Sequence, residues 1–383
     1  MLPKITVTNQ AIHSVQQGHP WLFSSQVKHN YPVGEPVLLV SSTSKGKILG
    51  FGIADAGDIS VRVLGKNPQQ ISFLLKERIT LASHFRQTMT RRDTNCYRLI
   101  NGAGDGLPGI IADRYADTVV LRLYSKAWNR YLDYIVQELG KLDGINRVYR
   151  KYGVRNVDGK NGGETLLGSS LPEYVLAQEY GLTFIIRPKE GQKTGFFLDQ
   201  REHRRLIGEI SQEKTVVNLF SYNGGFSLYA AKYGAKRVYS VDISASALED
   251  AKENFRLNGL DPAAHVFEAT DAFQWKCPEK VDLFICDPPS LSKGKKSDNK
   301  AKQAYRDLAK RCSEQIPKGG LLATASCTAR LSNNEWEKEI KEGIKSNGQW
   351  SWCWRSNEPF DHPIHLDHKE ARYLKFALLM RRK

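Results

Sequence analysis

The sequence predicts an α/β protein whose C-terminal half folds around a doubly wound, mainly parallel sheet. After Arg187-Pro188, short apolar segments alternate with longer segments of helical character. This alternation is typical of βαβ units, because each crossover helix returns the chain to add the next strand parallel to the last. A second observation is that glycines or acidic residues follow several of these segments, as they do at strand ends that face a ligand. The predicted strands cover residues 215–220, 237–241, 265–268, 281–286 and 320–324.

Length and pattern divide the chain into three predicted domains. A chain of 383 residues exceeds what one hydrophobic core usually serves. Near the N-terminus, short strands at 36–40, 48–53 and 59–64 are separated by turns, which predicts a small β-barrel. Apolar side chains at near-helical spacing predict a helix over 71–90 that links the barrel to the next domain. The predicted domains are a β-barrel over 1–68, an α+β domain over 69–186 and the α/β domain over 187–383.

The charge balance favours a polyanionic partner. The chain has 56 lysines and arginines against 41 acidic residues, which gives a net charge of +15. Each phosphate that a basic side chain neutralises releases counterions, so a basic excess suits a nucleic acid better than a single phosphate group. The alternative is that the protein is merely basic, as many soluble proteins are.

Cysteine spacing and the lack of long apolar segments narrow the class of protein further. The 6 cysteines are scattered, with no CxxC pair and no metal-ligand spacing with histidine, so neither a disulfide framework nor a bound metal is expected. Residues 1–7 lack the apolar core of a signal peptide, and no stretch approaches the ~20 apolar residues that span a bilayer. A reducing cytoplasm is the expected location.

The predicted strand ends carry the signs of a nucleoside-containing cofactor. Gly224-Gly225 follows the first strand and opens a helix, Asp242 follows the second strand, and Asp271 follows the third. Paired glycines let the backbone approach a ligand, and an acid after the second strand accepts hydrogen bonds from ribose hydroxyls. NAD and S-adenosylmethionine both fit this pattern, but the absence of GxGxxG weakly favours S-adenosylmethionine. Glycines and acidic residues also occur at strand ends that bind no ligand. Their occurrence after successive strands therefore indicates a cofactor more strongly than any one of them alone.

Two further residues suggest covalent chemistry on a pyrimidine. Asp287 begins an Asp-Pro-Pro turn after the fourth strand, and Cys327 lies in a Ser-Cys-Thr turn after the fifth. Addition of a thiolate to carbon 6 of cytosine makes carbon 5 nucleophilic enough to accept a methyl group. Cys327 is therefore the predicted nucleophile, and Asp287 is predicted to hold the N3 or amino edge of the base and to stabilise developing charge. The alternative is that Cys327 is a small apolar residue at a strand end, as Cys286 is expected to be.

Taken together, these segments resemble the bacterial and archaeal large-subunit (23S) ribosomal RNA cytosine-5 methyltransferases. The resemblance covers essentially the whole chain, and its most diagnostic parts are the segments 191–197 and 106–109. It implies an N-terminal PUA domain, a central EEHEE domain and a Rossmann-like class I methyltransferase domain with a mainly parallel, seven-stranded sheet that binds S-adenosylmethionine. The other matching segments are 18–23, 198–201, 218–227, 287–289, 326–327, 361–363 and the rest of 104–115, together with Asp242 and Asp271.

The resemblance also implies which residues contact the cofactor, and two departures from the family pattern are visible. Thr328 follows Cys327 where the family usually has serine, which keeps the hydroxyl, and Ser290-Leu291 replaces an aromatic residue after Pro-Pro. The ring that stacks on the target base is therefore undecided among Phe196, Phe197 and Tyr222. The predicted cofactor-binding residues are Lys193, Thr194, Phe196, Asp199, Gln200, Arg201, Asn218, Tyr222, Gly224, Gly225, Asp242, Ile243, Asp271, Ala272 and Asp287.

Two groups of lysines are predicted to contact RNA. A basic run lies directly after the Asp-Pro-Pro turn, where it can hold phosphates at the mouth of the site, and a second group lies in the predicted barrel. Solvated loops are the alternative for both groups. The predicted RNA-binding residues are Lys293, Lys295 and Lys296 in the first group and Lys45 and Lys47 in the second.

Three other functions compete with cytosine-5 methylation. The first is methylation of a guanine nitrogen, with Cys327 as a bystander. The second is a noncatalytic RNA-binding assembly factor that keeps the fold, and the third, a nicotinamide-dependent reductase, is disfavoured by the missing GxGxxG. The sequence also leaves open a homodimer.

Overall fold

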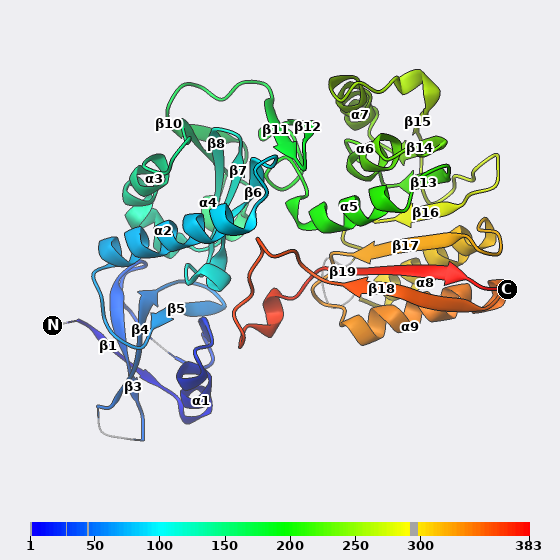
Figure 1. Ribbon diagram of the computed structural model, residues 1–383. Coiled ribbons are helices and arrows are strands. Elements are labelled where there is room, and N and C mark those ends of the chain that lie inside the picture. Colours follow the sequence, from blue (N-terminus) through cyan, green and yellow to red (C-terminus); the bar gives the residue numbers. More distant parts are fainter. Residues whose placement is uncertain (1, 28, 44–45, 292–297) are drawn as a thin grey trace. The chain divides into compact units, whose positions relative to one another are not determined.

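The computed structural model describes residues 2–27, 29–43, 46–291 and 298–383 (Figure 1). These residues form two compact units. The segments Ile186–Leu198 and Phe360–Ala371 belong to the first unit. The division of the chain into three domains stays a prediction. The first unit comprises Met1–Gly181, Ile186–Leu198 and Phe360–Ala371, and the second comprises Leu182–Ile185, Asp199–Pro359 and Arg372–Lys383.

The N-terminal part of the first unit is built on a five-stranded sheet in the order β1-β3-β4-β5-β2. The three strands that the alternating pattern predicted are β3, β4 and β5. The sequence did not reveal the helix α1 (Asn9–Gln17), because only Ala11 and Val15 of this short helix are buried. The strands are β1 (Lys4–Val7), β2 (Trp21–Phe23), β3 (Pro36–Ser41), β4 (Ile48–Ala54) and β5 (Ile59–Gly65).

A long helix leads into a second five-stranded sheet, which has the order β10-β9-β8-β7-β6. The helix α2 (Ile71–Met89) confirms the predicted helix over 71–90, and its buried residues Leu74, Leu75 and Ile79 lie on one face. Trp128 is fully buried, and its indole Nε1 donates a hydrogen bond of 2.8 Å to the carbonyl of Pro108. The elements are β6 (Cys96–Asn101), β7 (Ile110–Tyr115), β8 (Thr118–Leu123), α3 (Leu132–Gly140), β9 (Arg147–Lys151), α4 (Arg155–Asp158), β10 (Gly163–Leu167) and β11 (Val175–Glu179).

Buried hydrogen bonds explain why Phe360–Ala371 belongs to the first unit. The carboxylate of Asp361 accepts a bond of 2.9 Å from the backbone N–H of Arg98, and its carbonyl accepts one of 2.8 Å from the guanidinium of Arg86. Gly104 approaches this segment so closely that a Cβ there would lie 1.7 Å from the carbonyl oxygen of Pro363. A side chain at position 104 would therefore force the two backbones apart, which gives the Gly104 segment its requirement for glycine.

The second unit is organised around a seven-stranded sheet in the order β15-β14-β13-β16-β17-β19-β18 within the described residues. The strands β13 to β17 are parallel, whereas β19 runs antiparallel to β17 and to β18. This confirms the predicted mainly parallel sheet and adds two C-terminal strands that the sequence did not reveal. The strands of this sheet are β13 (Thr215–Leu219), β14 (Arg237–Asp242), β15 (Val266–Ala269), β16 (Leu283–Cys286), β17 (Leu321–Ser326), β18 (Trp350–Ser356) and β19 (Lys375–Arg381). The strand β12 (Leu182–Ile186) precedes them in the chain and is not part of this sheet.

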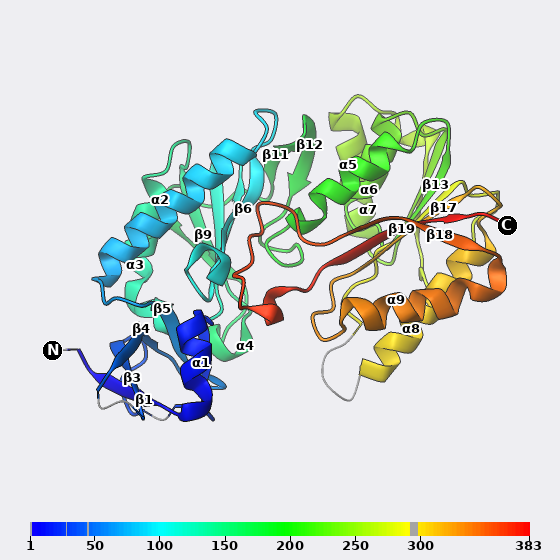
Figure 2. The same ribbon diagram turned by 60° about the horizontal axis from the view of Figure 1, so that its bottom comes forward.

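Helices cover both faces of this sheet (Figure 2). The chain moves from β13 to β14 on one side and later returns to β16 on the other side of β13. Such a reversal opens a crevice at the carboxyl ends of the strands, where ligands bind in open α/β sheets. In the described part of the chain, none of the helices has the length and apolarity that crossing a membrane demands. The helices are α5 (Arg201–Glu209), α6 (Gly225–Lys232), α7 (Ala245–Leu257), α8 (Asp298–Glu314) and α9 (Asn333–Ile344).

Candidate active site

The turn between β13 and α6 has a strained backbone. Phe220 has φ 59°, Tyr222 has φ 50° and Gly224 has φ 77°, so three of five successive residues adopt the left-handed conformation. A non-glycine side chain rarely adopts this conformation, and such residues cluster at functional sites when the surrounding structure holds them in place. At Gly224 a Cβ would also lie 2.8 Å from the Cβ of Ala251. The turn thus keeps its backbone close to the helix N-terminus at the carboxyl end of β13.

Asp242, at the end of β14, holds this turn. Its Oδ2 accepts a hydrogen bond of 2.8 Å from the backbone N–H of Tyr222, and its Oδ1 accepts one of 2.9 Å from the backbone N–H of Ser244. The carboxylate therefore supports the two loops that follow β13 and β14. Its neighbour Ile243 is 79% exposed, which leaves an apolar side chain at the rim of the crevice for a ligand to cover.

Polar atoms at the end of β13 fit a nucleoside-containing ligand. The amide Nδ2 of Asn218 donates to the hydroxyl of Ser227 at 3.0 Å, whereas its Oδ1 is buried without a hydrogen-bond partner among the described residues. The hydroxyl of Ser221 is likewise buried without a partner in the described chain. Because unpaired buried polar atoms are costly, these two are candidates for contact with a bound group. At the end of β15, Oδ1 of Asp271 accepts a bond of 2.9 Å from the backbone N–H of Phe273.

Asp287 lies directly after β16 and receives a hydrogen bond through a chain of polar residues. Nε2 of Gln200 donates to Oδ2 of Asp287 at 2.9 Å. Nδ1 of His203 bonds to Oε1 of Gln200, and Nε2 of His203 bonds to the hydroxyl of Ser356 at 2.8 Å. Because the amide donates to Asp287, its oxygen faces the histidine, so Nδ1 carries the proton and Nε2 accepts from Ser356. The chain orients the carboxylate at the sheet edge.

His203 is neutral in the folded protein. It is buried and stacks on Phe376, with ring centroids 4.1 Å apart and planes 8° apart. Burial lowers the pKa of His203 to about 3, although the negative charge of Asp199 acts to raise it. A neutral imidazole has one donor and one acceptor, as this hydrogen-bond chain requires.

We expect His203 to make the protein less stable in acid. The unfolded chain binds a proton at this histidine below about pH 6.5, whereas the folded chain does so only near pH 3, so stability is complete above pH 6.5 and falls as the pH drops toward 3. The slope contributed by one such group is at most about 1.4 kcal/mol per pH unit. Urea unfolding at pH 7 and pH 5 measures it. His203→Phe, which keeps a ring against Phe376, should show a smaller loss between the two pH values; an equal loss would contradict this assignment.

The turn that carries Cys327 is held by a buried tyrosine. The hydroxyl of Tyr305 lies 2.8 Å from the hydroxyl of Ser326 and 3.0 Å from that of Thr328. The backbone N–H of Thr328 donates to the Ser326 hydroxyl at 3.2 Å. Burial raises the pKa of Tyr305 to about 12, so this residue stays neutral at pH 7. The hydroxyl that the threonine retains is thus part of the network that shapes the Cys327 turn.

The predicted cofactor segment is divided between the two units. Lys193, Thr194 and Phe196 belong to the first unit, and Asp199, Gln200 and Arg201 belong to the second. Thr194 is 2% exposed, and its hydroxyl bonds to Asp113 at 2.6 Å and to Tyr115 at 2.9 Å. Asp113 and Tyr115 belong to β7 of the second five-stranded sheet. We therefore expect Thr194 to hold the segment against this strand rather than to contact a ligand.

The remaining residues of this segment have mixed surroundings. Phe196 is buried, whereas the ammonium of Lys193 lies 4.8 Å from the ring centroid of Phe197. The hydroxyl of Tyr373 donates to Oδ2 of Asp199 at 2.6 Å, and Arg201 is fully buried. A role in cofactor binding stays a prediction for all of them, as it does for Ile243 and Ala272.

Most predicted RNA-binding lysines fall outside the part of the chain that the structure describes. These are Lys45, Lys293, Lys295 and Lys296, whereas Lys47 is exposed at the turn before β4.

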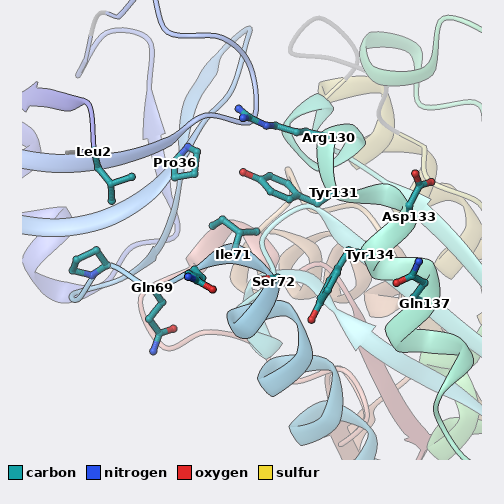
Figure 3. A pocket seen from close by; sticks show the side chains of 12 residues that line it. Leu2, Pro36, Gln69, Ile71, Ser72, Arg130, Tyr131, Asp133, Tyr134 and Gln137 are labelled. Atoms are coloured by element: carbon teal, nitrogen blue, oxygen red, sulfur yellow. The ribbon is translucent and has the colours of Figure 1, made fainter.

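The first unit contains a hollow of about 750 Å³ between the start of α2 and α3 (Figure 3). None of the predicted cofactor residues lines it. Its wall includes Tyr131, whose hydroxyl donates to the carbonyl of Gly34 and so ties the two sheets of this unit together.

Comparison with known proteins first defines the class. Residues 155–345 match a family model described as an S-adenosylmethionine-dependent methyltransferase, and residues 5–66 match one described as a PUA-like domain. The fold is similar to that of a methyltransferase crystallised with S-adenosylhomocysteine, with a TM-score of 0.88, 24% identity and coverage of 99% of this chain and 100% of that chain. A methyltransferase structure from Streptococcus mutans gives a TM-score of 0.85 at 24% identity, with the same coverage of 99% and 100%. The fold is that of an S-adenosylmethionine-dependent methyltransferase.

Curated relatives define the family. A ribosomal RNA large subunit methyltransferase from Deinococcus radiodurans is 35% identical, over 98% of this chain and 97% of that protein. Ribosomal RNA large subunit methyltransferase I from Shewanella denitrificans is 31% identical, over 94% of this chain and 95% of that protein. The chain belongs to the family of ribosomal RNA large subunit methyltransferases.

Proposed function

We propose that this protein methylates carbon 5 of a cytosine in large-subunit (23S) ribosomal RNA, with Cys327 as the nucleophile. One observation carries the proposal. Asp287 directly follows β16 and Cys327 directly follows β17, and these two strands are adjacent and parallel, with Cys286 opposite Thr324. Both side chains therefore lie at one edge of the sheet, the edge where β13 and β14 present the strained turn and Asp242. The names of the relatives support the RNA substrate.

The proposed reaction is a covalent addition followed by elimination. S-adenosylmethionine supplies an electrophilic methyl group. The thiolate of Cys327 forms a bond to carbon 6, and the displaced electron pair makes carbon 5 nucleophilic, so carbon 5 takes the methyl group. A base then removes the proton from carbon 5, and the bond between sulfur and carbon 6 breaks to restore the ring and the thiolate.

Asp287 acts on the opposite edge of the ring in this proposal. It holds the N3 or amino edge of cytosine and, when protonated, stabilises the charge that develops during addition. Gln200 fixes the direction of the carboxylate through its hydrogen bond to Oδ2. A carboxylate held in place before the base arrives needs no reorganisation during the reaction.

The target base must leave its stack to reach this edge. Unstacking costs a few kcal/mol, which favours nucleotides in loops and junctions. The net charge of +15 and the PUA-like domain support binding to the surrounding RNA. A reducing cytoplasm suits a catalytic thiol, and we propose it as the location.

Nucleoside mass spectrometry tests the proposal. Large-subunit RNA from cells that lack the protein is incubated with the purified chain and isotopically labelled S-adenosylmethionine, then digested and mapped. We expect one labelled 5-methylcytidine, at a position that is unmethylated only in the RNA from cells without the protein. A labelled methylguanosine would show the guanine-directed reaction instead. No labelled nucleoside, together with retained RNA binding, would favour the assembly factor.

A further inference from the structure

Lys375 lies beside the Cys327 turn. It is the first residue of β19 and pairs with Ser326, the last residue of β17. The residue is only 3% exposed. Its ammonium donates hydrogen bonds of 3.0 Å to the carbonyl of Thr328 and 3.0 Å to that of Tyr373. The ammonium therefore contacts the backbone of the turn that carries the predicted nucleophile.

This buried cation has no close carboxylate partner. Among the residues that the structure describes, no carboxylate oxygen lies within 4.0 Å of Nζ. Glu358 acts on Lys375 from farther away, and its Oε1 is engaged by the backbone N–H groups of Tyr373 and Leu374 at 2.7 and 2.8 Å. Buried charges are normally paired, because loss of hydration costs several kcal/mol per ion. Two carbonyl oxygens replace part of that hydration but carry no full negative charge.

Burial and the neighbouring charges oppose each other at this lysine. Burial lowers the pKa of Lys375, whereas Glu358, Cys327 and Glu335 raise it. Cys327 thus belongs to the groups whose negative charge favours the charged lysine. An ammonium has three donors, and two of them are used by Thr328 and Tyr373. The thiolate of Cys327 is the counter-charge that the turn itself can supply.

We propose that Lys375 is the positioning residue that stabilises the thiolate of Cys327. The assignment rests on the proposed role of Cys327 as nucleophile. The thiol proton leaves to solvent, and the ammonium keeps its own three protons throughout. Of the other titratable groups around the turn, Tyr305 on α8 is neutral, and Asp287, Glu335 and Glu358 are acids that disfavour a thiolate. The cations Lys302 and Arg330 are each paired with an acid, Glu335 and Asp298 respectively.

The thiol pKa itself gives the direct test. The protein is exposed to short pulses of iodoacetamide from pH 5.5 to 10, and alkylation is measured for each cysteine-containing peptide by mass spectrometry. The exposed Cys353 serves as the reference within the same chain. We expect Cys327 to reach half of its maximal rate at a lower pH than Cys353, because an adjacent cation favours the thiolate.

Removal of the charge should shift this curve. In Lys375→Met the half-maximal pH of Cys327 should rise by about one unit or more, which is about tenfold less thiolate near pH 7, while that of Cys353 stays the same. Lys375→Arg keeps the charge and should retain most of the effect. Lys375→Gln keeps a donor for the Thr328 carbonyl without the charge, so it gives the same test if the methionine variant does not bind S-adenosylmethionine. An unchanged curve for Cys327 in the uncharged variants overturns the proposal.

Kinetics separate this role from a structural one. In Lys375→Met, methyl transfer at pH 7 should fall about tenfold and recover as the pH rises toward 9, because hydroxide then generates the thiolate. A lysine that only holds the turn would lower the rate by the same factor at every pH, which would contradict the proposal. The alkylation shift requires no RNA, so it stands or falls independently of which nucleotide is methylated.

Discussion

Replacement of Cys327 by alanine should lower kcat for methyl transfer by about 10⁴-fold or more, because the covalent route loses the atom that attacks carbon 6. The side chain is small and lies in a turn whose shape depends on the hydroxyls of Ser326 and Thr328 and on Tyr305. The alanine variant should therefore keep its fold and its affinity for S-adenosylmethionine. The measurement is single-turnover transfer of labelled methyl groups to large-subunit RNA, with calorimetry for the cofactor.

A matched control separates the nucleophile from other thiols. Cys353 is exposed on β18, and Cys353→Ala should leave methyl transfer within about twofold of the original rate, as is usual for an exposed residue away from the site. RNA that contains 5-fluorocytidine adds a second readout, because fluorine at carbon 5 prevents the elimination step and a covalent complex should accumulate. Undiminished methyl transfer by Cys327→Ala would overturn the covalent mechanism and favour methylation of a guanine nitrogen.

Replacement of Asp287 by asparagine is expected to have the second-largest effect, a fall in kcat of about 10² to 10³-fold. The substitution keeps the size of the side chain but removes the negative charge and the acidic proton. The chain from Ser356 through His203 presents the amide N–H of Gln200 to this position, and an asparagine can satisfy it only with its carbonyl oxygen. The amide would then direct its own NH₂ group, which is a donor only, toward the base.

The effect should appear in kcat rather than in the affinity for RNA. Single-turnover rates at saturating RNA measure it, and filter binding gives the affinity. Asp133→Asn, on the exposed side of α3, is a suitable control for loss of one negative charge. If Asp287→Asn weakens RNA binding but leaves the rate at saturation unchanged, the residue binds substrate without taking part in the reaction.

The pattern of the sequence was sufficient for the framework of the second unit. The strands β13, β14, β15, β16 and β17 were all predicted, because buried parallel strands are short apolar runs and their ends are marked by residues that cannot continue a strand. The same logic located Asp242, Asp271 and Asp287 at strand ends, since the order of residues along the chain determines which of them comes next after a strand. The edge strand β18 was not predicted because its pairing is irregular between Trp352 and Trp354, which disrupts the alternation of its side chains.

The supports of the site depend on three-dimensional contacts that no local pattern encodes. His203 and Ser356 are 153 positions apart and share a hydrogen bond, and Lys375 bonds to Thr328 across 47 positions. A buried lysine or histidine in a sequence looks like any surface residue of its type, because burial depends on which segments pack over it. The order of residues along the chain thus determines which strand end carries each reactive group. The orientation and protonation of that group depend on partners that only folding brings within 3 Å of it.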